Sequence, residues 1–158
     1  MNPEPHVNAR VTRRFSASPE RVFDAWLDPE MIGRWMFGPV IRDEEVVRIS
    51  LDARVGGAFS FVVRRQGEEI DHVGEYLEID RSRRLAFTWG VRQELRDRTR
   101  VIVDIVPQET GCALTLTHEL RPDWVNFASQ AEAAWAQMLD SLAATLGENA
   151  ETAASGDG

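Results

Sequence analysis

The sequence contains no lysine, and all 18 of its basic residues are arginine. Without lysine the chain can form neither a Schiff base with a carbonyl substrate nor a phosphate-binding loop that depends on a lysine. Cysteine is nearly absent as well, since Cys112 is the only one. The chain therefore has no intrachain disulfide and no cysteine-rich metal site, which is typical of a reducing compartment.

Long apolar runs and an excess of positive charge are also missing. No stretch approaches the roughly 20 apolar residues of a membrane span, and residues 1–10 lack the apolar run of a signal peptide. The formal net charge of −8 argues against nucleic acid as a partner, because phosphate binding needs clustered positive charge. We therefore expect a cytoplasmic protein that neither inserts into a membrane nor binds nucleic acid.

The sequence does have enough apolar material for a folded core. Its 158 residues are 43% hydrophobic, which fits one domain of ordinary size. We predict a single domain over residues 7–147. Residues 1–6 and 148–158 are predicted to be flexible tails, because they are polar and lie at the ends of the chain.

The first part of this domain reads as one strand and two short helices. Residues 7–16 alternate between apolar and polar side chains, which predicts a strand. Each helix then begins with a capping side chain, a proline and an acid, in Ser18-Pro19-Glu20 and in Asp28-Pro29-Glu30. Apolar residues recur on one face of both helices, so we expect each to lie against an apolar surface.

The rest of the domain reads as six strands and a long helix. Alternation with a period of two, broken by turn residues, predicts strands over 42–51, 57–65, 70–79, 84–93, 98–107 and 112–120. A helix is predicted over 124–147, with an apolar stripe made by Phe127, Ala131, Trp135, Met138, Leu139, Leu142 and Leu146. Asp123, Asn126 or Ser129 could cap its start, and Gly147 would end it.

These elements predict an α+β helix-grip fold in the order β-α-α-β6-α. Short connections between successive strands favour an antiparallel meander, and a twisted seven-stranded sheet curls. The long C-terminal helix is the one large apolar element that could cover the concave face. A single helix cannot fill such a face, so we expect a cavity between sheet and helix, where a small molecule could bind.

Four groups of residues then carry a resemblance to a known family. They are Phe15–Trp26; Arg34–Pro39; Val55–Phe61 with Gly74–Asp80 and Leu85–Trp89; and Leu114–Leu120 with Trp135. Together, over about residues 7–147, they resemble the activator of heat-shock-protein-90 ATPase homologue-like family of the SRPBCC (START and birch-pollen-allergen-like) superfamily. The resemblance implies the helix-grip fold. The superfamily includes lipid and hormone carriers, polyketide cyclases and co-chaperones, so the fold alone does not select a function.

The expected lining of the cavity is mostly aromatic. We expect it to consist of Trp26, Trp35, Phe37, Phe59, Phe61, His72, Tyr76, Phe87, Trp89, Val103, Leu116, His118, Trp135, Met138 and Leu139. As a set these side chains would suit a flat apolar or aromatic ligand, although any one of them taken alone more often belongs to a filled core. Trp26 and the Trp35–Phe37 segment are expected at the entrance, with Trp35–Phe37 forming a hydrophobic lip.

Two histidines are candidates for polar contacts. His118 should face the cavity, where it would orient a ligand, shuttle a proton, or serve as a core histidine bonded to a neighbour. His72 and Tyr76 lie on the same face of their strand, but a bulge at Gly74 could move one of them to the other face. The sequence therefore does not decide which face of this strand points into the cavity. The two histidine strands lie three positions apart, about 14 Å. A shared ion needs ligands near 2 Å, so we predict no metal and no cofactor.

Three functions remain open. The first, which we favour, is binding of a hydrophobic or aromatic small molecule: a lipid, a sterol-like compound, a polyketide or a flavonoid-type aromatic. The second is a cofactor-free cyclase or aromatase-type enzyme in which His118, a tyrosine or a strand acid serves as acid–base group. The strand acids are Asp71, Glu75, Glu78, Asp104 and Glu119. The third is a protein-interaction or co-chaperone-like domain, which an exposed apolar patch at Trp35 and Phe37 would support.

Overall fold

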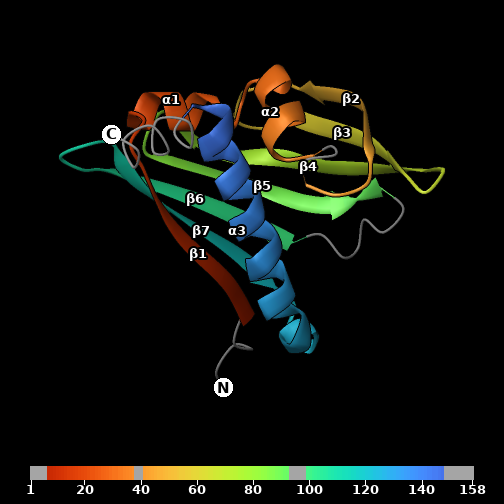
Figure 1. Ribbon diagram of the computed structural model, residues 1–158. Coiled ribbons are helices and arrows are strands. Elements are labelled where there is room, and N and C mark those ends of the chain that lie inside the picture. The colour runs from red at the N-terminus through yellow and green to blue at the C-terminus, as the bar shows by residue number, and fades with distance from the viewer. Residues whose placement is uncertain (1–6, 38–40, 93–98, 148–158) are drawn as a thin grey trace.

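The computed structural model describes residues 7–37, 41–92 and 99–147 (Figure 1). In chain order the elements are β1 (Val7–Phe15), α1 (Pro19–Asp24), α2 (Pro29–Trp35), β2 (Glu45–Leu51), β3 (Ala58–Arg65), β4 (Glu68–Asp80), β5 (Arg84–Val91), β6 (Thr99–Pro107), β7 (Cys112–Leu120), the 3₁₀ helix η2 (Pro122–Phe127) and α3 (Ala128–Thr145). The predicted strands are confirmed, with ends that differ by a few residues. The predicted tails lie outside the described residues.

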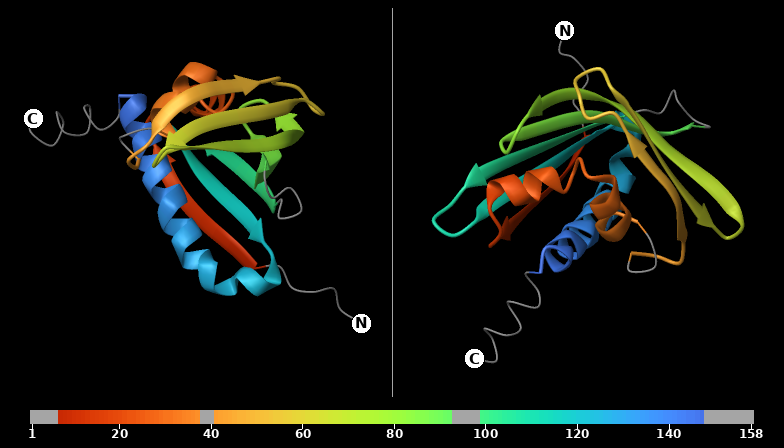
Figure 2. Two further views of the ribbon diagram at one scale, coloured as in Figure 1. Left: turned by 90° about the vertical axis from the view of Figure 1, so that its right-hand side faces the viewer. Right: turned by 90° about the horizontal axis from the view of Figure 1, so that it is seen from above.

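The strands form one seven-stranded sheet in the order β1-β7-β6-β5-β4-β3-β2, and every neighbouring pair is antiparallel. The sheet curves strongly, and α3 runs across its concave side while α1 and α2 lie over the upper end (Figures 1 and 2). The helix-grip α+β fold predicted from the sequence is therefore confirmed. Both proposed caps are confirmed too, since Ser18 accepts from Arg21 N–H and Asp28 from Glu30 N–H.

The start of α3 differs from the prediction. The N-cap position is Phe127 and not Asp123, Asn126 or Ser129, and the Phe127 side chain makes no capping hydrogen bond. The 3₁₀ turn of η2 runs directly into α3, so Ala128 N–H donates to the carbonyl of Val125. Phe127 was also expected on the buried stripe, but it belongs to this turn and is 44% exposed.

The end of α3 agrees with the prediction. Gly147 has a φ of +89° and donates its N–H to the carbonyl of Ala144, which is the left-handed stop that glycine favours. Between its ends the helix buries one stripe against the sheet, including Trp135, Leu139 and Leu142. Among the described helices, none has the length and apolar character needed to cross a membrane.

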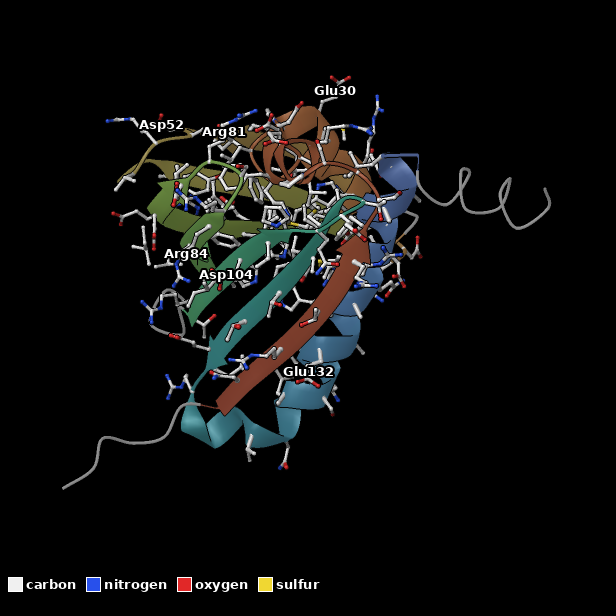
Figure 3. The ribbon with its side chains drawn as sticks, turned by 90° about the vertical axis from the view of Figure 1, so that its left-hand side faces the viewer. Glu30, Asp52, Arg81, Arg84, Asp104 and Glu132 are labelled. Atoms are coloured by element: carbon white, nitrogen blue, oxygen red, sulfur yellow. The ribbon has the colours of Figure 1, made fainter. Side chains whose placement is uncertain are left out.

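Polar contacts fasten α3 to the edge strand β1. The backbone N–H of Arg10 donates to Glu132 Oε2 at 3.0 Å, and Arg13 Nε donates to Asp140 Oδ1 at 2.8 Å. Glu132 reaches from α3 towards β1 in Figure 3. An edge strand leaves backbone groups unpaired that could join another chain. Here the helix that covers the concave face also occupies part of that edge.

Close packing of β3 against β4 depends on a glycine. Gly74 lies opposite Phe59 in the ladder, and a Cβ at this position would overlap both the Phe59 ring and the carbonyl oxygen of Thr88 on β5. A neighbouring backbone cannot move aside as a flexible side chain can. The glycine therefore allows the Phe59 ring to lie flat against the inner surface of the sheet.

We expect Gly74→Ala to lower the free energy of unfolding by about 2–3 kcal/mol, because the added methyl group overpacks the interior. Gly33→Ala in α2 is the matched control: its Cβ would meet only side chains, the nearest at 3.7 Å. That change should leave stability equal or raise it by up to about 1 kcal/mol. Urea unfolding measures both, and equal losses in the two variants would contradict the packing argument.

Candidate functional site

The aromatic side chains predicted to line a cavity form one connected group in the interior. Neighbouring ring centroids lie between 4.6 and 6.5 Å apart. The group consists of Trp26, Trp35, Phe37, Phe59, Phe61, His72, Tyr76, Phe87, Trp89, His118 and Trp135. The four aliphatic members of the predicted lining, Val103, Leu116, Met138 and Leu139, pack in the same core.

The open question of which face of β4 points inward is settled by the register. His72 and Tyr76 are buried, at 8% and 2% exposure, whereas Leu77 is 39% exposed. A bulge does occur in this strand, but it lies at Leu77, because Tyr76 pairs with Phe87 while Glu78 pairs with Ala86. The alternation is therefore unbroken from His72 to Tyr76, and both polar side chains face the aromatic interior.

The predicted lip at the entrance is wrong. Trp35, Met36 and Phe37 are at most 1% exposed and belong to the core, and Trp26 is also buried. The apolar face of α2 turns inward: Trp35 Nε1–H donates to the carbonyl of Ala25 at 3.0 Å, and the Trp35 ring packs edge-on against Trp26. The exposed patch that would have supported a protein-interaction domain is therefore not present at these residues.

A small void lies inside the aromatic group. Its volume is about 10 Å³, and it is lined by Trp26, Met36, Phe59, Phe61, Tyr76 and Phe87. This is room for about one water, whereas a site for a drug-sized ligand measures roughly 300–1,000 Å³. A ligand in this position would have to push the lining side chains apart.

Two of the residues that line this void carry polar groups without partners among the described residues. Trp26 Nε1–H is fully buried and donates to nothing there. The Tyr76 hydroxyl makes no hydrogen bond to a described residue, and burial raises the pKa of this phenol well above its ordinary value. The hydroxyl therefore stays protonated and can donate. Both groups can meet a polar atom of a bound molecule.

His118 has a partner on each ring nitrogen. Trp135 Nε1–H donates to His118 Nδ1 at 3.2 Å, so Nδ1 carries no proton. The proton sits on Nε2, which donates to Thr99 Oγ1 at 2.6 Å, and Thr99 donates in turn to the carbonyl of Trp89 at 3.2 Å. Burial lowers the pKa of His118 to about 4. Of the roles considered for it, this geometry matches a neutral core histidine with no free lone pair.

His72 has the opposite arrangement. A backbone carbonyl can only accept, so His72 Nδ1 carries the proton that it donates to the Phe61 carbonyl at 3.1 Å. Its Nε2 then holds a lone pair, and no described residue donates to it. The ring lies between those of Phe37 and Trp89, at centroid distances of 4.9 and 5.4 Å. Burial is the main cause that lowers the pKa of His72.

A charged group beside His72 was missed in the sequence. The Glu44 side chain is fully buried and accepts from Arg65 Nε and Nη2 at 3.1 and 2.8 Å, while Arg42 Nη1 lies 3.8 Å from the same oxygen. A buried carboxylate needs such pairing. The sequence did contain a sign of this burial. Glu44 precedes the apolar Val46 by two residues, and side chains two apart in a strand lie on the same face.

The acids considered for an enzyme do not face the interior. Asp104 pairs with Arg84 on the neighbouring strand, and Figure 3 shows these two side chains on the convex face. Glu119 pairs with Arg100 on its neighbouring strand. Glu78 also pairs with Arg84, Asp71 pairs with Arg92, and Glu75 is exposed. In the described ranges, no three histidine, cysteine or acidic side chains gather as a metal site would require. The absence of a cofactor stays a prediction.

We expect the two histidines to be opposite tautomers at neutral pH. His118 should carry its proton on Nε2 and His72 on Nδ1, because of the partners of their Nδ1 atoms. Long-range proton–nitrogen NMR correlation spectra of the histidine rings distinguish the two forms. The variants His118→Gln and His72→Asn assign the signals. Two identical tautomers would show that one of these hydrogen bonds is wrong.

The buried His118 also predicts how stability depends on pH. Its folded pKa of about 4 lies below the ordinary 6.5, so the unfolded chain takes up a proton first as the pH falls. The contribution of His118 is complete above pH 6.5 and should fall by about 3 kcal/mol by pH 4. Denaturant unfolding across this range should give a flatter profile for His118→Gln than for the wild type, and parallel profiles would contradict the assignment.

The chain is similar to known proteins over most of its length. A solved structure from Chromobacterium violaceum is 28% identical, with a TM-score of 0.75 over 87% of this chain and 95% of that chain. An AHSA1-like protein from Aeromonas hydrophila is 21% identical, with a TM-score of 0.75 over 90% of this chain and 94% of that chain. A protein from Rhodobacter sphaeroides is 19% identical, with a TM-score of 0.78 over 89% of this chain and 92% of that chain. These two structures show a shared fold. No curated protein matches. The family model described as "Activator of Hsp90 ATPase homolog 1-like protein" matches residues 16–147, and the chain belongs to this family.

Proposed function

We propose that the protein binds a flat apolar or aromatic small molecule between the concave face of β3–β5 and the helices α1, α2 and α3. The observation that carries this proposal is Trp26 Nε1–H, a buried donor without a described partner on a residue that lines the aromatic void. Leaving such a group unpaired costs about 1–3 kcal/mol. A ligand that carries an acceptor would recover this energy.

The lining favours planar ligands among the classes considered. The Phe59 and Phe61 rings stack with an interplanar angle of 23°, and Trp26 and Trp135 stack with an angle of 28°. A flat ring system can slide between such faces, whereas a bulky chain would have to separate them along its whole length. Polyketide and flavonoid-type aromatics therefore fit this interior better than fatty acids do.

Binding requires the void to widen, and its lining contains a side chain suited to this. Met36 ends α2 and closes one side of the void. Methionine is unbranched and adapts to irregular spaces at low cost. Apolar surface removed from water then supplies affinity at roughly 25 cal/mol per Å². The Trp26 N–H and the Tyr76 hydroxyl would set the orientation of the ligand.

The other two functions have less support. A cyclase-type enzyme could not use His118 as its acid–base group, since both nitrogens of that ring are occupied. A protein-interaction domain loses the surface first expected for it, because Trp35 and Phe37 are buried. The enzyme alternative is left with His72 and Tyr76 as its candidate acid–base groups, and the protein-interaction alternative with no exposed patch at the residues expected for it.

The test is a titration of ¹⁵N-labelled protein with planar polyphenols, sterols and fatty acids, followed through the tryptophan indole N–H signals. We expect a planar ligand to shift the Trp26 signal strongly, because that N–H gains an acceptor. The Trp35 and Trp135 signals are internal controls, since their N–H groups already donate to Ala25 and His118. Single Trp→Phe variants assign the signals.

The protein must first be shown to be free of ligand by native mass spectrometry. If no compound then shifts the Trp26 signal, the interior is a filled core and the proposal is overturned. A shift of equal size in all the indole signals would indicate a general loosening of the structure, and it would also contradict a specific site.

A further inference from the structure

His72 adds chemical detail to the ligand, in an inference that rests on the proposed function. The residue is 8% exposed, and no described residue donates to its Nε2 lone pair. Among the described residues, the one fully buried side-chain nitrogen or oxygen without a partner is Trp26 Nε1, so the Nε2 atom of His72 is one that another molecule can reach. The folded protein therefore holds an unused acceptor within its aromatic interior.

An aromatic wall connects this acceptor to the void. Phe61 lines the void, and its ring lies 5.9 Å from that of Phe37, which in turn lies 4.9 Å from the His72 ring. Trp89 packs on both Phe59 and His72, at 6.0 and 5.4 Å. A planar ligand that separates these rings would have one edge near His72.

The backbone decides which nitrogen is available. The Phe61 carbonyl holds the proton on Nδ1, and this carbonyl belongs to the neighbouring strand at the paired position of the ladder. The geometry of the sheet therefore fixes Nε2 as the acceptor. A ligand group that forms a hydrogen bond with Nε2 must therefore be the donor.

The surrounding charge decides what kind of donor fits. Arg42 and Arg65 share the single carboxylate of Glu44, so this group has one net positive charge. Its members act electrostatically on His72. A positive surrounding disfavours an ammonium group and favours a donor whose oxygen gains negative charge as it donates. A phenol or an enol meets this condition.

We propose that His72 Nε2 accepts a hydrogen bond from a phenolic or enolic hydroxyl of an aromatic ligand bound in the interior. The same molecule with that hydroxyl methylated would leave Nε2 unpaired, and a site built to bond a hydroxyl rejects the analogue that lacks it. Tyr76 is the rival partner for the hydroxyl, because its own phenol also has no described partner.

The experiment compares 2-naphthol with 2-methoxynaphthalene, which share the ring system and differ in the donor. Dissociation constants come from quenching of tryptophan fluorescence. We expect the wild type to bind 2-naphthol about tenfold more tightly, the size of one well-formed hydrogen bond. The same ratio is then measured in three variants that separate His72 from Tyr76.

His72→Asn keeps an amide donor at the position of Nδ1 but removes Nε2, so the ratio should fall to about one while 2-methoxynaphthalene binds as before. His72→Gln places an amide oxygen near the position of Nε2 and should recover part of the ratio. Tyr76→Phe removes the rival partner; because Tyr76 lines the void, this change should lower the affinity for both compounds while the ratio between them persists. Unchanged binding of the methyl ether shows that the two His72 variants are folded, and urea unfolding shows this for Tyr76→Phe.

Equal affinity of the two compounds in the wild type would overturn this inference and leave the proposed function standing. A ratio that survives His72→Asn but disappears in Tyr76→Phe would assign the hydroxyl to Tyr76 and also overturn it. Failure of both compounds to bind would overturn the proposed function together with this inference. If His72→Asn does not fold, the ¹⁵N chemical shift of His72 Nε2 in the wild type is measured instead. The inference requires this shift to change when 2-naphthol binds and to remain unchanged when 2-methoxynaphthalene binds.

Discussion

The arrangement of the interior depends on the hydrogen bond from Trp135 Nε1–H to His118 Nδ1. It joins α3 to β7 and begins a chain of bonds that continues through Thr99 on β6 to the Trp89 carbonyl on β5. One indole group of the helix is thereby linked to three strands of the sheet. The bond also holds the Trp135 ring against Trp26 and Trp89, which places the helix over the aromatic group.

Burial alone would not have separated the two histidines. His118 and His72 are 6% and 8% exposed, and burial lowers the pKa of both. They differ in what their neighbours offer: one ring receives an indole N–H, while the other faces a backbone carbonyl. The first histidine therefore belongs to the framework, and the second keeps a nitrogen available. For this protein the partners of each atom carry more functional information than the depth of the residue.

The sequence predicts the strands and the short helix caps well, because alternation and capping are local patterns. It fails where the answer depends on distant segments. The apolar residues in and directly after α2 show that Trp35 and Phe37 avoid water, but not whether they cover a core or an entrance. The bulge at Leu77 has no local signature. The partners of His118 lie 17 and 19 residues away in sequence, so their geometry exists only once helix and sheet have met.

The pairing of β1 with β7 has a consequence for how the molecule forms. The first strand lies beside the last one, in register from Val7 with Leu120 to Phe15 with Cys112, and Arg10 bonds to Glu132, 122 residues further along. Such distant contacts slow folding because a long loop must close first. On the ribosome, β1 emerges before the other described strands and lacks its neighbour until β7 has been synthesised. The sheet is therefore completed late, by the strand that is synthesised before its six partners.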